Sequence, residues 1–132
     1  RRPDGSHRDV AVYARSRSLV AAKAQGRLAL DAVHMDIADL DGLRVACEDA
    51  AAVGFDATVA VHPSQVPVIR AAYRPSAEQV VWARGLLEAH GEDGGVGTFQ
   101  GRMVDGPVFR QAVRVLILEQ ASGGATPVEV GR

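Results

Sequence analysis

Hydrophobic and small residues recur at helical spacing in the first third of the chain. Over residues 8–25 they stand three or four positions apart, and Gly26 is a natural C-terminal stop for a helix. A second such segment, residues 39–55, begins at Asp39, a residue type favoured as an N-cap, and has Gly54 near its end. We therefore predict helices over both segments.

Two shorter apolar runs lie between and after these helices and predict strands. "RLALDAVHM", residues 27–35, is one of them, and "ATVAV", residues 57–61, is the other. The second run consists of small and β-branched residues, which is typical of a strand buried on both faces. His62 and Pro63 end it, because proline cannot donate a hydrogen bond to a sheet.

The remainder of the chain is predicted to be helical, with glycine-rich interruptions. The tract "HGEDGGVG" is expected to form a loop, and the tail "SGGATPVEVGR" is expected to fray. Pro107 suits the first turn of a final helix. We predict three further helices, over residues 64–73, 76–90 and 107–121.

This alternation of helices with buried strands is typical of a parallel α/β protein. Only two strands are predicted, however, and two parallel strands cannot form a sheet that helices cover on both faces. The pattern therefore predicts that the chain is part of a larger α/β architecture.

The charge balance changes this picture little, but it excludes some functions. The 132 residues are 47% hydrophobic, and 15 Lys and Arg offset 16 Asp and Glu to give a net charge of −1. This balance argues against a nucleic-acid-binding face and against a polybasic membrane anchor. The densest basic group is either a solvated surface or a contact for an anionic ligand such as a phosphate; it comprises Arg1, Arg2, Arg8, Arg15 and Arg17.

Cys47 is the only cysteine, so one chain can form neither a disulfide nor a zinc–cysteine cluster. Its place in the run Val45-Ala46-Cys47 predicts a small buried thiol. No apolar run approaches the roughly 18 residues of a membrane span, and the first residues do not resemble a signal peptide. We expect a soluble, cytoplasmic protein.

Asp36, Asp39 and Asp41 place three carboxylates across the start of the helix predicted over residues 39–55. Magnesium prefers carboxylate ligands together with waters and substrate oxygens, so these residue types would permit a metal site. Carboxylates across a helix start, however, more often cap the helix and compensate its dipole. We favour the capping role.

Three stretches, in this order, carry a resemblance to a known family: "GFDATVAVHPSQVPVI", "YRPSAEQVVWA" and "GRMVDGPV". From about Arg8 to Leu116 the chain resembles the carboxyl-terminal half of citrate lyase β-subunit-like proteins of the HpcH/HpaI aldolase family, which includes malyl-CoA and citramalyl-CoA lyases. The fold implied is a (β/α)8 TIM barrel. Residues 1–73 would be its last βα units, with the seventh and eighth strands, and residues 74–132 would be carboxyl-terminal helices and a Gly-rich lid.

The resemblance implies a carbon–carbon lyase acting on 3-hydroxyacyl-CoA thioesters of the citryl, malyl or citramalyl class. Such enzymes use Mg²⁺-assisted Claisen-type cleavage or condensation. By the resemblance, a glutamate and an aspartate from the ends of the fifth and sixth strands hold Mg²⁺, and an arginine from the first half grips the substrate. None of these has a matching position here. We therefore predict no metal ligand in this chain, and we expect the chain to be incomplete as an enzyme.

Active sites of TIM barrels lie at the carboxyl ends of the strands. Asp31, Val33 and Asp36 follow or end the first predicted strand, and His62 and Pro63 end the second. By the resemblance, these five residues are expected to bind CoA or the substrate. An unpaired carboxylate inside a strand would be costly, so Asp31 needs a partner or a ligand. His62 is either part of a strand-end turn or a wall of the CoA channel.

Asp105 is the candidate catalytic residue. In the family that this sequence resembles, the Gly-rich stretch forms a lid over the active site of a neighbouring subunit in a homotrimer. The aspartate of "MVDGP" then exchanges a proton with the acyl carbon, which is general acid–base catalysis. The alternative is that Asp105 only caps the last helix, two residues before Pro107.

Two other functions stay open at this point. One is a metal-dependent 2-oxo-acid aldolase, against which the intact "GRMVDGP" segment counts, because that extension accompanies acyl-CoA substrates. The other is a non-catalytic fragment with a CoA-binding or structural role.

Overall fold

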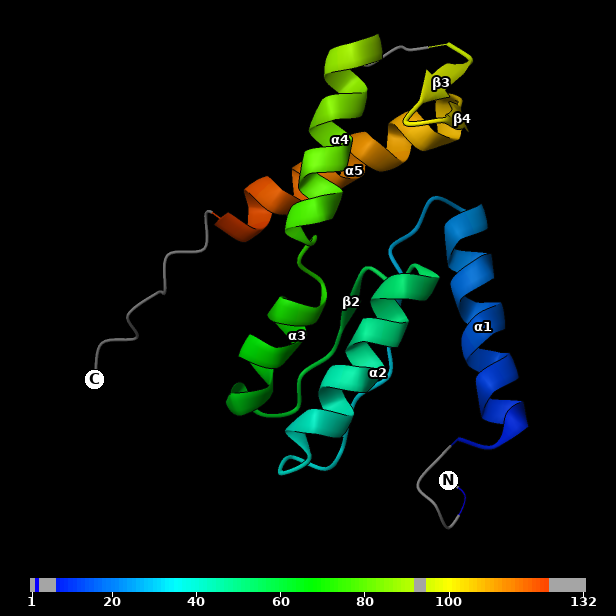
Figure 1. Cartoon of the computed structure of the whole chain (residues 1–132). Coiled ribbons are helices and arrows are strands. Elements are labelled where there is room, and N and C mark those ends of the chain that lie inside the picture. The colour runs from blue at the N-terminus through cyan, green and yellow to red at the C-terminus, as the bar shows by residue number, and fades with distance from the viewer. Residues whose placement is uncertain (1, 3–6, 92–94, 124–132) are drawn as a thin grey trace. The chain divides into compact units, whose positions relative to one another are not determined.

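Helices and short strands alternate along the part of the chain that the computed structural model describes, residues 2, 7–91 and 95–123 (Figure 1). The chain divides into two compact units, Arg1–Tyr73 and Arg74–Arg132. This boundary coincides with the one placed between residues 73 and 74 from the sequence.

The first unit follows the predicted helix–strand alternation. Strands β1 and β2 pair in parallel, with Leu30 opposite Ala57 and Asp31 opposite Thr58. The parallel pair of the α/β class is therefore present. The elements are α1 (Asp9–Ala24), β1 (Leu30–Asp31), α2 (Leu40–Val53), β2 (Ala57–Thr58), the 3-10 helix η1 (Pro63–Gln65) and α3 (Val66–Ala72).

The two ends of α2 confirm the sequence prediction. The Asp39 side chain accepts a hydrogen bond from the Gly42 backbone N–H at 2.9 Å, as expected of an N-cap. Gly54 has φ of +108° and donates its N–H to the carbonyl oxygens of Ala50 and Ala51. This left-handed conformation favours glycine, which is why the helix stops there.

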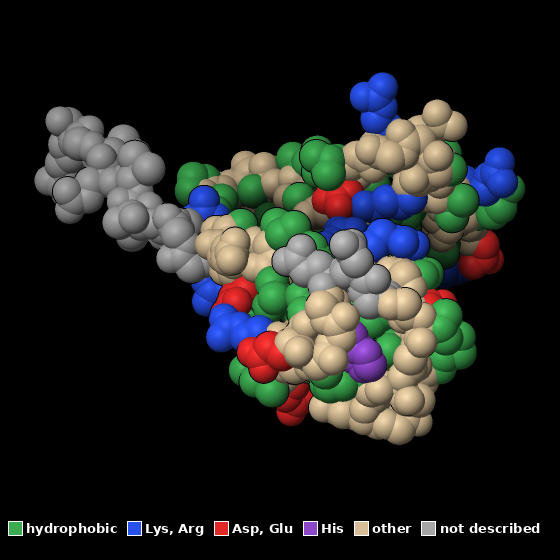
Figure 2. All heavy atoms as spheres, turned by 90° about the horizontal axis from the view of Figure 1, so that it is seen from above, with side chains coloured by type: hydrophobic (Ala, Val, Ile, Leu, Met, Phe, Trp, Pro, Cys, Tyr) green, Lys and Arg blue, Asp and Glu red, His purple; other side chains and the backbone are tan. Residues whose placement is uncertain are grey.

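The strands are much shorter than residues 27–35 and 57–61, the spans predicted for them. Within the described residues β1 and β2 pair only with each other, so no second neighbour extends either hydrogen-bond ladder. Apolar side chains of both predicted strands are exposed as a result; Leu28 is 78% and Leu30 59% accessible. Hydrophobic side chains lie among the charged ones on the face shown in Figure 2.

Two small apolar clusters hold the first unit together. Ala29, Ala50 and Phe55 form one beneath α1, and Leu43, Cys47 and Ile69 form the other between α2 and α3. Cys47 is fully buried, so the prediction of a buried thiol is confirmed.

The second unit is a helical hairpin, and the segment that joins its two helices forms a small sheet. Helices α4 (Ala77–His90) and α5 (Gly106–Gly123) pack on each other around Ala83, Leu86 and Phe109. Ser76 and Gln79 form a reciprocal capping box at the start of α4.

An antiparallel hairpin was not predicted in the glycine-rich region. Strands β3 (Gly97–Phe99) and β4 (Arg102–Val104) pair through residues expected to be part of an irregular lid. Gln100 and Gly101 both have positive φ, 50° and 74°, and so provide the tight turn that joins the strands. The predicted frayed tail lies outside the described residues from 124 onward, and residues 122–123 belong to α5.

None of the helices in the described segments is long and apolar enough to cross a membrane.

Candidate active site

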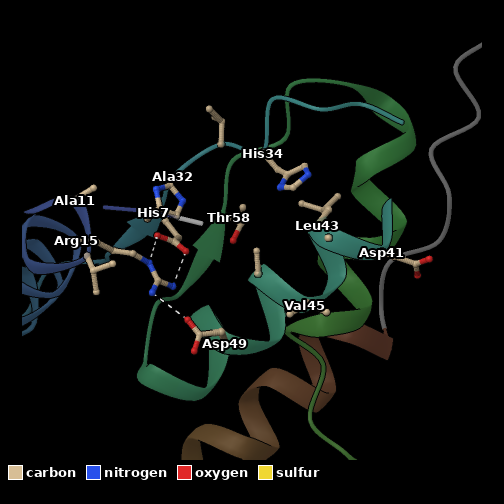
Figure 3. A pocket seen from close by; sticks show the side chains of 15 residues that line it. His7, Ala11, Arg15, Ala32, His34, Asp41, Leu43, Val45, Asp49 and Thr58 are labelled. Carbon is tan, nitrogen blue, oxygen red and sulfur yellow. Dashed lines mark hydrogen bonds and ion pairs between the residues drawn. The ribbon is translucent and has the colours of Figure 1, made fainter. Parts of the chain in front are cut away.

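A cavity of about 680 Å³ opens in the first unit at the carboxyl end of β1 (Figure 3). Arg15 reaches it from α1, Thr58 from β2 and Asp49 from α2, while His34 lies in the segment after β1. Much of the remaining lining is small or apolar, including Val33. The cavity therefore combines an apolar wall with a charged corner, as ligand sites commonly do.

The charged corner is built on Asp31. Its carboxylate accepts two hydrogen bonds from the Arg15 guanidinium, at 2.8 and 2.9 Å, and its side chain is only 10% exposed. Arg15 also donates to Asp49 at 3.0 Å and lies 4.9 Å from the centre of the Phe55 ring. The hydrogen bonds with Asp31 raise the pKa of Arg15 above its ordinary value. Asp31 thus has the partner that its burial demands.

The five predicted binding residues do not all meet at this cavity. Asp31 and Val33 line it, whereas Asp36, His62 and Pro63 are not among its lining residues. The role of all five residues in binding CoA or the substrate stays a prediction.

The other three residues have local roles in their turns. The Asp36 carboxylate accepts hydrogen bonds from the N–H groups of Ala38 and Asp39, at 3.1 and 3.3 Å. The exposed His62 ring accepts from the Ser64 N–H at 3.2 Å, and Pro63 opens η1. These contacts agree with a turn-forming role and leave the outer faces of the residues free to meet a ligand.

His34 was not singled out from the sequence, yet its ring lines the cavity. Its Nε2 lies 3.3 Å from an oxygen of Asp39, within ion-pair distance, but makes no hydrogen bond among the described residues. The His34 side chain is only 11% exposed, so its Nε2 is a buried polar atom with unfilled hydrogen-bonding capacity.

Gln65 is a second residue that the sequence analysis missed. Its side chain is fully buried. Its Oε1 accepts from the Val61 N–H at 2.9 Å, and its Nε2 donates to the His34 carbonyl oxygen at 2.9 Å. One amide thus ties the segment after β1 to the segment after β2, which are the two segments that carry the predicted binding residues.

Replacing Gln65 by leucine in the full-length protein should loosen both segments. The Val61 N–H and the His34 carbonyl would lose their partner, which typically costs about 1–3 kcal/mol for buried groups. We expect faster hydrogen exchange at the Val61 amide, measured by NMR, together with a lower free energy of unfolding.

Tyr73→Phe is the matched control, because it removes another internal hydrogen bond, the 2.9 Å bond between Tyr73 and Thr58. It should lower stability without speeding exchange at Val61. Equal exchange at Val61 in both variants would show that Gln65 does not fix these segments.

Burial also changes the pKa of two groups beside the cavity. Desolvation raises the pKa of the Cys47 thiol, and a hydrogen bond with Thr58 opposes that rise. Desolvation likewise raises the pKa of Tyr73. Both groups are therefore neutral at physiological pH, and Cys47 is not a thiolate nucleophile.

Asp105 lies in the second unit, at the junction of β4 and α5, and is half-buried. Its backbone carbonyl accepts from the N–H groups of Val108 and Phe109, at 3.0 and 3.1 Å. One carboxylate oxygen lies 3.4 Å from the Val108 N–H, a long hydrogen bond. Asp105 thus occupies the N-cap position of α5, and its weakly held carboxylate has hydrogen-bonding capacity left for another partner.

The described residues contain no group of three or more His, Cys, Asp or Glu that could hold a metal ion. Asp36 and Asp39 serve the turn and the helix start, and Asp41 lies 3.9 Å from Arg44. The residues that the structure describes therefore do not fit a magnesium site by themselves.

The arginines near the start of the chain have different surroundings. Arg15 lines the cavity and pairs with Asp31, so the first of the two alternatives, a solvated surface, does not hold for this residue. Arg2 pairs with Asp9 at 2.7 Å, while Arg8 and Arg17 are exposed. Arg1 lies outside the described residues. The sequence signal for Arg15 is its place on the same side of α1 as Leu19 and Ala22, which pack against the core.

Comparison with known proteins identifies the family. The HpcH/HpaI aldolase/citrate lyase family matches residues 2–63. The citrate lyase subunit beta-like protein of Mycobacterium tuberculosis is 57% identical over 116 residues, which are 88% of this chain and 42% of that protein. Residues 2–63 of this chain belong to the HpcH/HpaI aldolase/citrate lyase family.

Other members of the family are also similar. The mitochondrial citramalyl-CoA lyase of Rattus norvegicus is 39% identical over 111 residues, 81% of this chain and 33% of that protein. The crystal structure of the M. tuberculosis protein CitE in complex with magnesium, acetoacetate and coenzyme A matches with a TM-score of 0.78 and 55% identity. That match covers 91% of this chain and 45% of the CitE chain. The chain thus spans less than half the length of these relatives.

Proposed function

We propose that the complete protein is a carbon–carbon lyase acting on 3-hydroxyacyl-CoA thioesters of the citryl, malyl or citramalyl class. One observation carries this proposal: nearly the whole chain matches, at 55% identity, the structure of a protein bound to magnesium, acetoacetate and coenzyme A. Coenzyme A is the thiol half of such a thioester substrate, and acetoacetate is an oxo acid, the class of product that such a cleavage releases.

We also propose that the chain forms the carboxyl-terminal part of a (β/α)8 barrel, with β1 and β2 as its last two strands. The parallel pairing of β1 with β2 supports this, since barrel strands are all parallel. So does the exposure of Leu28 and Leu30, because neighbouring strands and helices would cover such residues in a closed barrel. The cavity at the carboxyl end of β1 lies where barrel enzymes place their sites.

Asp105 is the proposed catalytic residue. In the cleavage direction the β-hydroxyl loses its proton to solvent water and becomes a carbonyl, the bond between the α and β carbons of the thioester breaks, and the α carbon keeps the electron pair as an enolate. The carboxylic acid of Asp105 gives its proton to that carbon, and in condensation the carboxylate removes it. The weakly held carboxylate at the start of α5 supports this role, because it has little to lose by turning to a substrate.

Magnesium would supply stabilisation of oxyanion charge in this reaction. The related CitE structures contain it, but the described residues here offer no suitable group. We propose that its ligands lie in the rest of the protein's length.

The proposed assembly is a homotrimer in which the lid of one subunit, residues 97–107, completes the site of another. The proposed compartment is the cytoplasm; the similar citramalyl-CoA lyase of the rat is named as mitochondrial. Asp31, Val33, Asp36, His62 and Pro63 are proposed to contact the CoA thioester.

The test is an assay of the full-length protein with magnesium against citryl-, malyl- and citramalyl-CoA, and against 2-oxo-acid aldol substrates. Release of an acyl-CoA and an oxo acid from at least one thioester would support the proposal. Turnover of the aldol substrates alone would favour a 2-oxo-acid aldolase. Binding of CoA without turnover of either class would favour a non-catalytic role.

A further inference from the structure

His90, the last residue of α4, contacts β3 and the first turn of α5, two elements close to Asp105 in the second unit. Its Nε2 donates a hydrogen bond to the Thr98 carbonyl of β3 at 3.2 Å. Its ring meets Phe99 edge-on, with centroids 6.4 Å apart, and Phe109 of α5 in the same way at 5.9 Å. Edge-to-face contacts at these distances are favourable.

The first route from His90 to Asp105 runs through the sheet. A Cβ added to Gly97 would lie 3.1 Å from the His90 Cε1, so the ring rests directly on the backbone there. Gly97 pairs with Val104 in the antiparallel register, and Val104 is the buried residue that immediately precedes Asp105. The position of the ring therefore helps to set the end of β4.

The second route runs through the first turn of α5. Phe109 is buried, and its N–H donates to the backbone carbonyl of Asp105 at 3.1 Å. The His90 ring packs against the Phe109 ring and so holds that turn against α4. Both backbone segments that flank Asp105 are thus connected to the His90 side chain. The segment before it is connected through Gly97 and its partner Val104, and the segment after it through Phe109.

We propose that His90 is a positioning residue for the reaction: it pins β3, β4 and the start of α5 to the end of α4, and so sets where the Asp105 carboxylate lies. This inference rests on the proposed function of Asp105. His90 itself does not act on the substrate. Small displacements of a catalytic group matter, since a shift of about 1 Å can cost roughly 10²-fold in rate.

The test compares three variants of the full-length protein. His90→Ala removes the ring and the hydrogen bond, His90→Phe keeps a ring, and His90→Gln keeps a donor for the Thr98 carbonyl. We expect His90→Ala to lower kcat by roughly 10-fold, a fraction of the cost of a 1 Å shift, with little change in KM. His90→Phe and His90→Gln should each restore part of kcat, because each keeps one of the two kinds of contact.

Arg84→Gln is the matched control, because Arg84 also ties α4 to α5, through Glu119 at 2.8 Å, but at the end of α5 that lies away from Asp105. It should leave kcat unchanged. An equal fall of kcat in Arg84→Gln and His90→Ala would overturn the proposal, since general loosening of the two helices would then explain both.

The same measurements in an Asp105→Asn background separate this inference from the proposed function. If His90 acts through Asp105, His90→Ala should lower kcat no further once Asp105 is gone, whereas independent effects multiply. A low kcat in Asp105→Asn with a normal kcat in His90→Ala would overturn the inference alone. A normal kcat in Asp105→Asn would overturn the proposed role of Asp105 and this inference with it.

Discussion

Replacing Asp105 by asparagine in the full-length protein should lower kcat by roughly 10²–10⁴-fold, the usual contribution of general acid–base catalysis. Asparagine keeps the shape of the side chain but cannot exchange the proton. KM should change little, because the binding residues lie elsewhere. Steady-state kinetics with the thioester that the wild-type protein cleaves would measure both constants.

Asp105→Ala separates this role from helix capping at the same position. Asparagine caps a helix about as well as aspartate, whereas alanine typically loses about 1 kcal/mol. We therefore expect both variants to lose activity and only Asp105→Ala to melt at a lower temperature. Normal turnover in Asp105→Asn with a destabilised Asp105→Ala would reduce Asp105 to a cap of α5.

Mixed assemblies would test the proposed exchange of the lid between subunits. Asp105→Asn subunits would be combined with subunits that lack a magnesium carboxylate. If the lid acts on a neighbour, each inactive chain supplies what the other lacks and some activity returns. No recovery in confirmed mixed trimers would contradict an exchanged lid.

Replacing Arg15 by methionine should destabilise the full-length protein by about 2–4 kcal/mol. Removing one partner of a buried pair commonly costs about 3–5 kcal/mol, and the 28% exposure of Arg15 reduces that figure. The loss arises because the Asp31 carboxyl group, only 10% exposed, would be left buried without a partner. Denaturant unfolding would measure it.

Arg44→Met is the matched control for that experiment. Arg44 is half exposed on α2 and pairs with Glu48 one turn away at 3.1 Å, a surface contact that contributes about 0.3–0.5 kcal/mol. The double variant Arg15→Met/Asp31→Leu should recover much of the loss, since apolar groups can replace a buried ion pair. Equal losses in Arg15→Met and Arg44→Met would contradict the structural role of the Arg15–Asp31 pair.

Local chemistry explains what the sequence predicted well. Asp39 and Gly54 delimit α2 through contacts within a few residues, and such caps can be identified from residue type and spacing alone. Cys47 is buried, as the apolar run around it indicates. The parallel pairing of β1 and β2 follows from their separation by a helix.

Long-range contacts explain what the sequence did not predict. Asp31 clearly needed a partner, but Arg15 is 16 positions away, and only the packing of α1 brings it close. Gln65 joins backbone groups of Val61 and His34, the second of which lies 31 positions away. The hairpin of β3 and β4 was missed because its strands are three residues long, too short for an alternating pattern to be visible.

The most direct measurement of the central claim follows the proton itself. The full-length protein, supplied with magnesium, would be incubated in D₂O with the acyl-CoA that its own cleavage reaction releases, and mass spectrometry would follow deuterium at the carbon next to the thioester. The account predicts steady incorporation by the wild-type protein and a loss of roughly 10²-fold or more in Asp105→Asn. Incorporation at the wild-type rate in Asp105→Asn would contradict it.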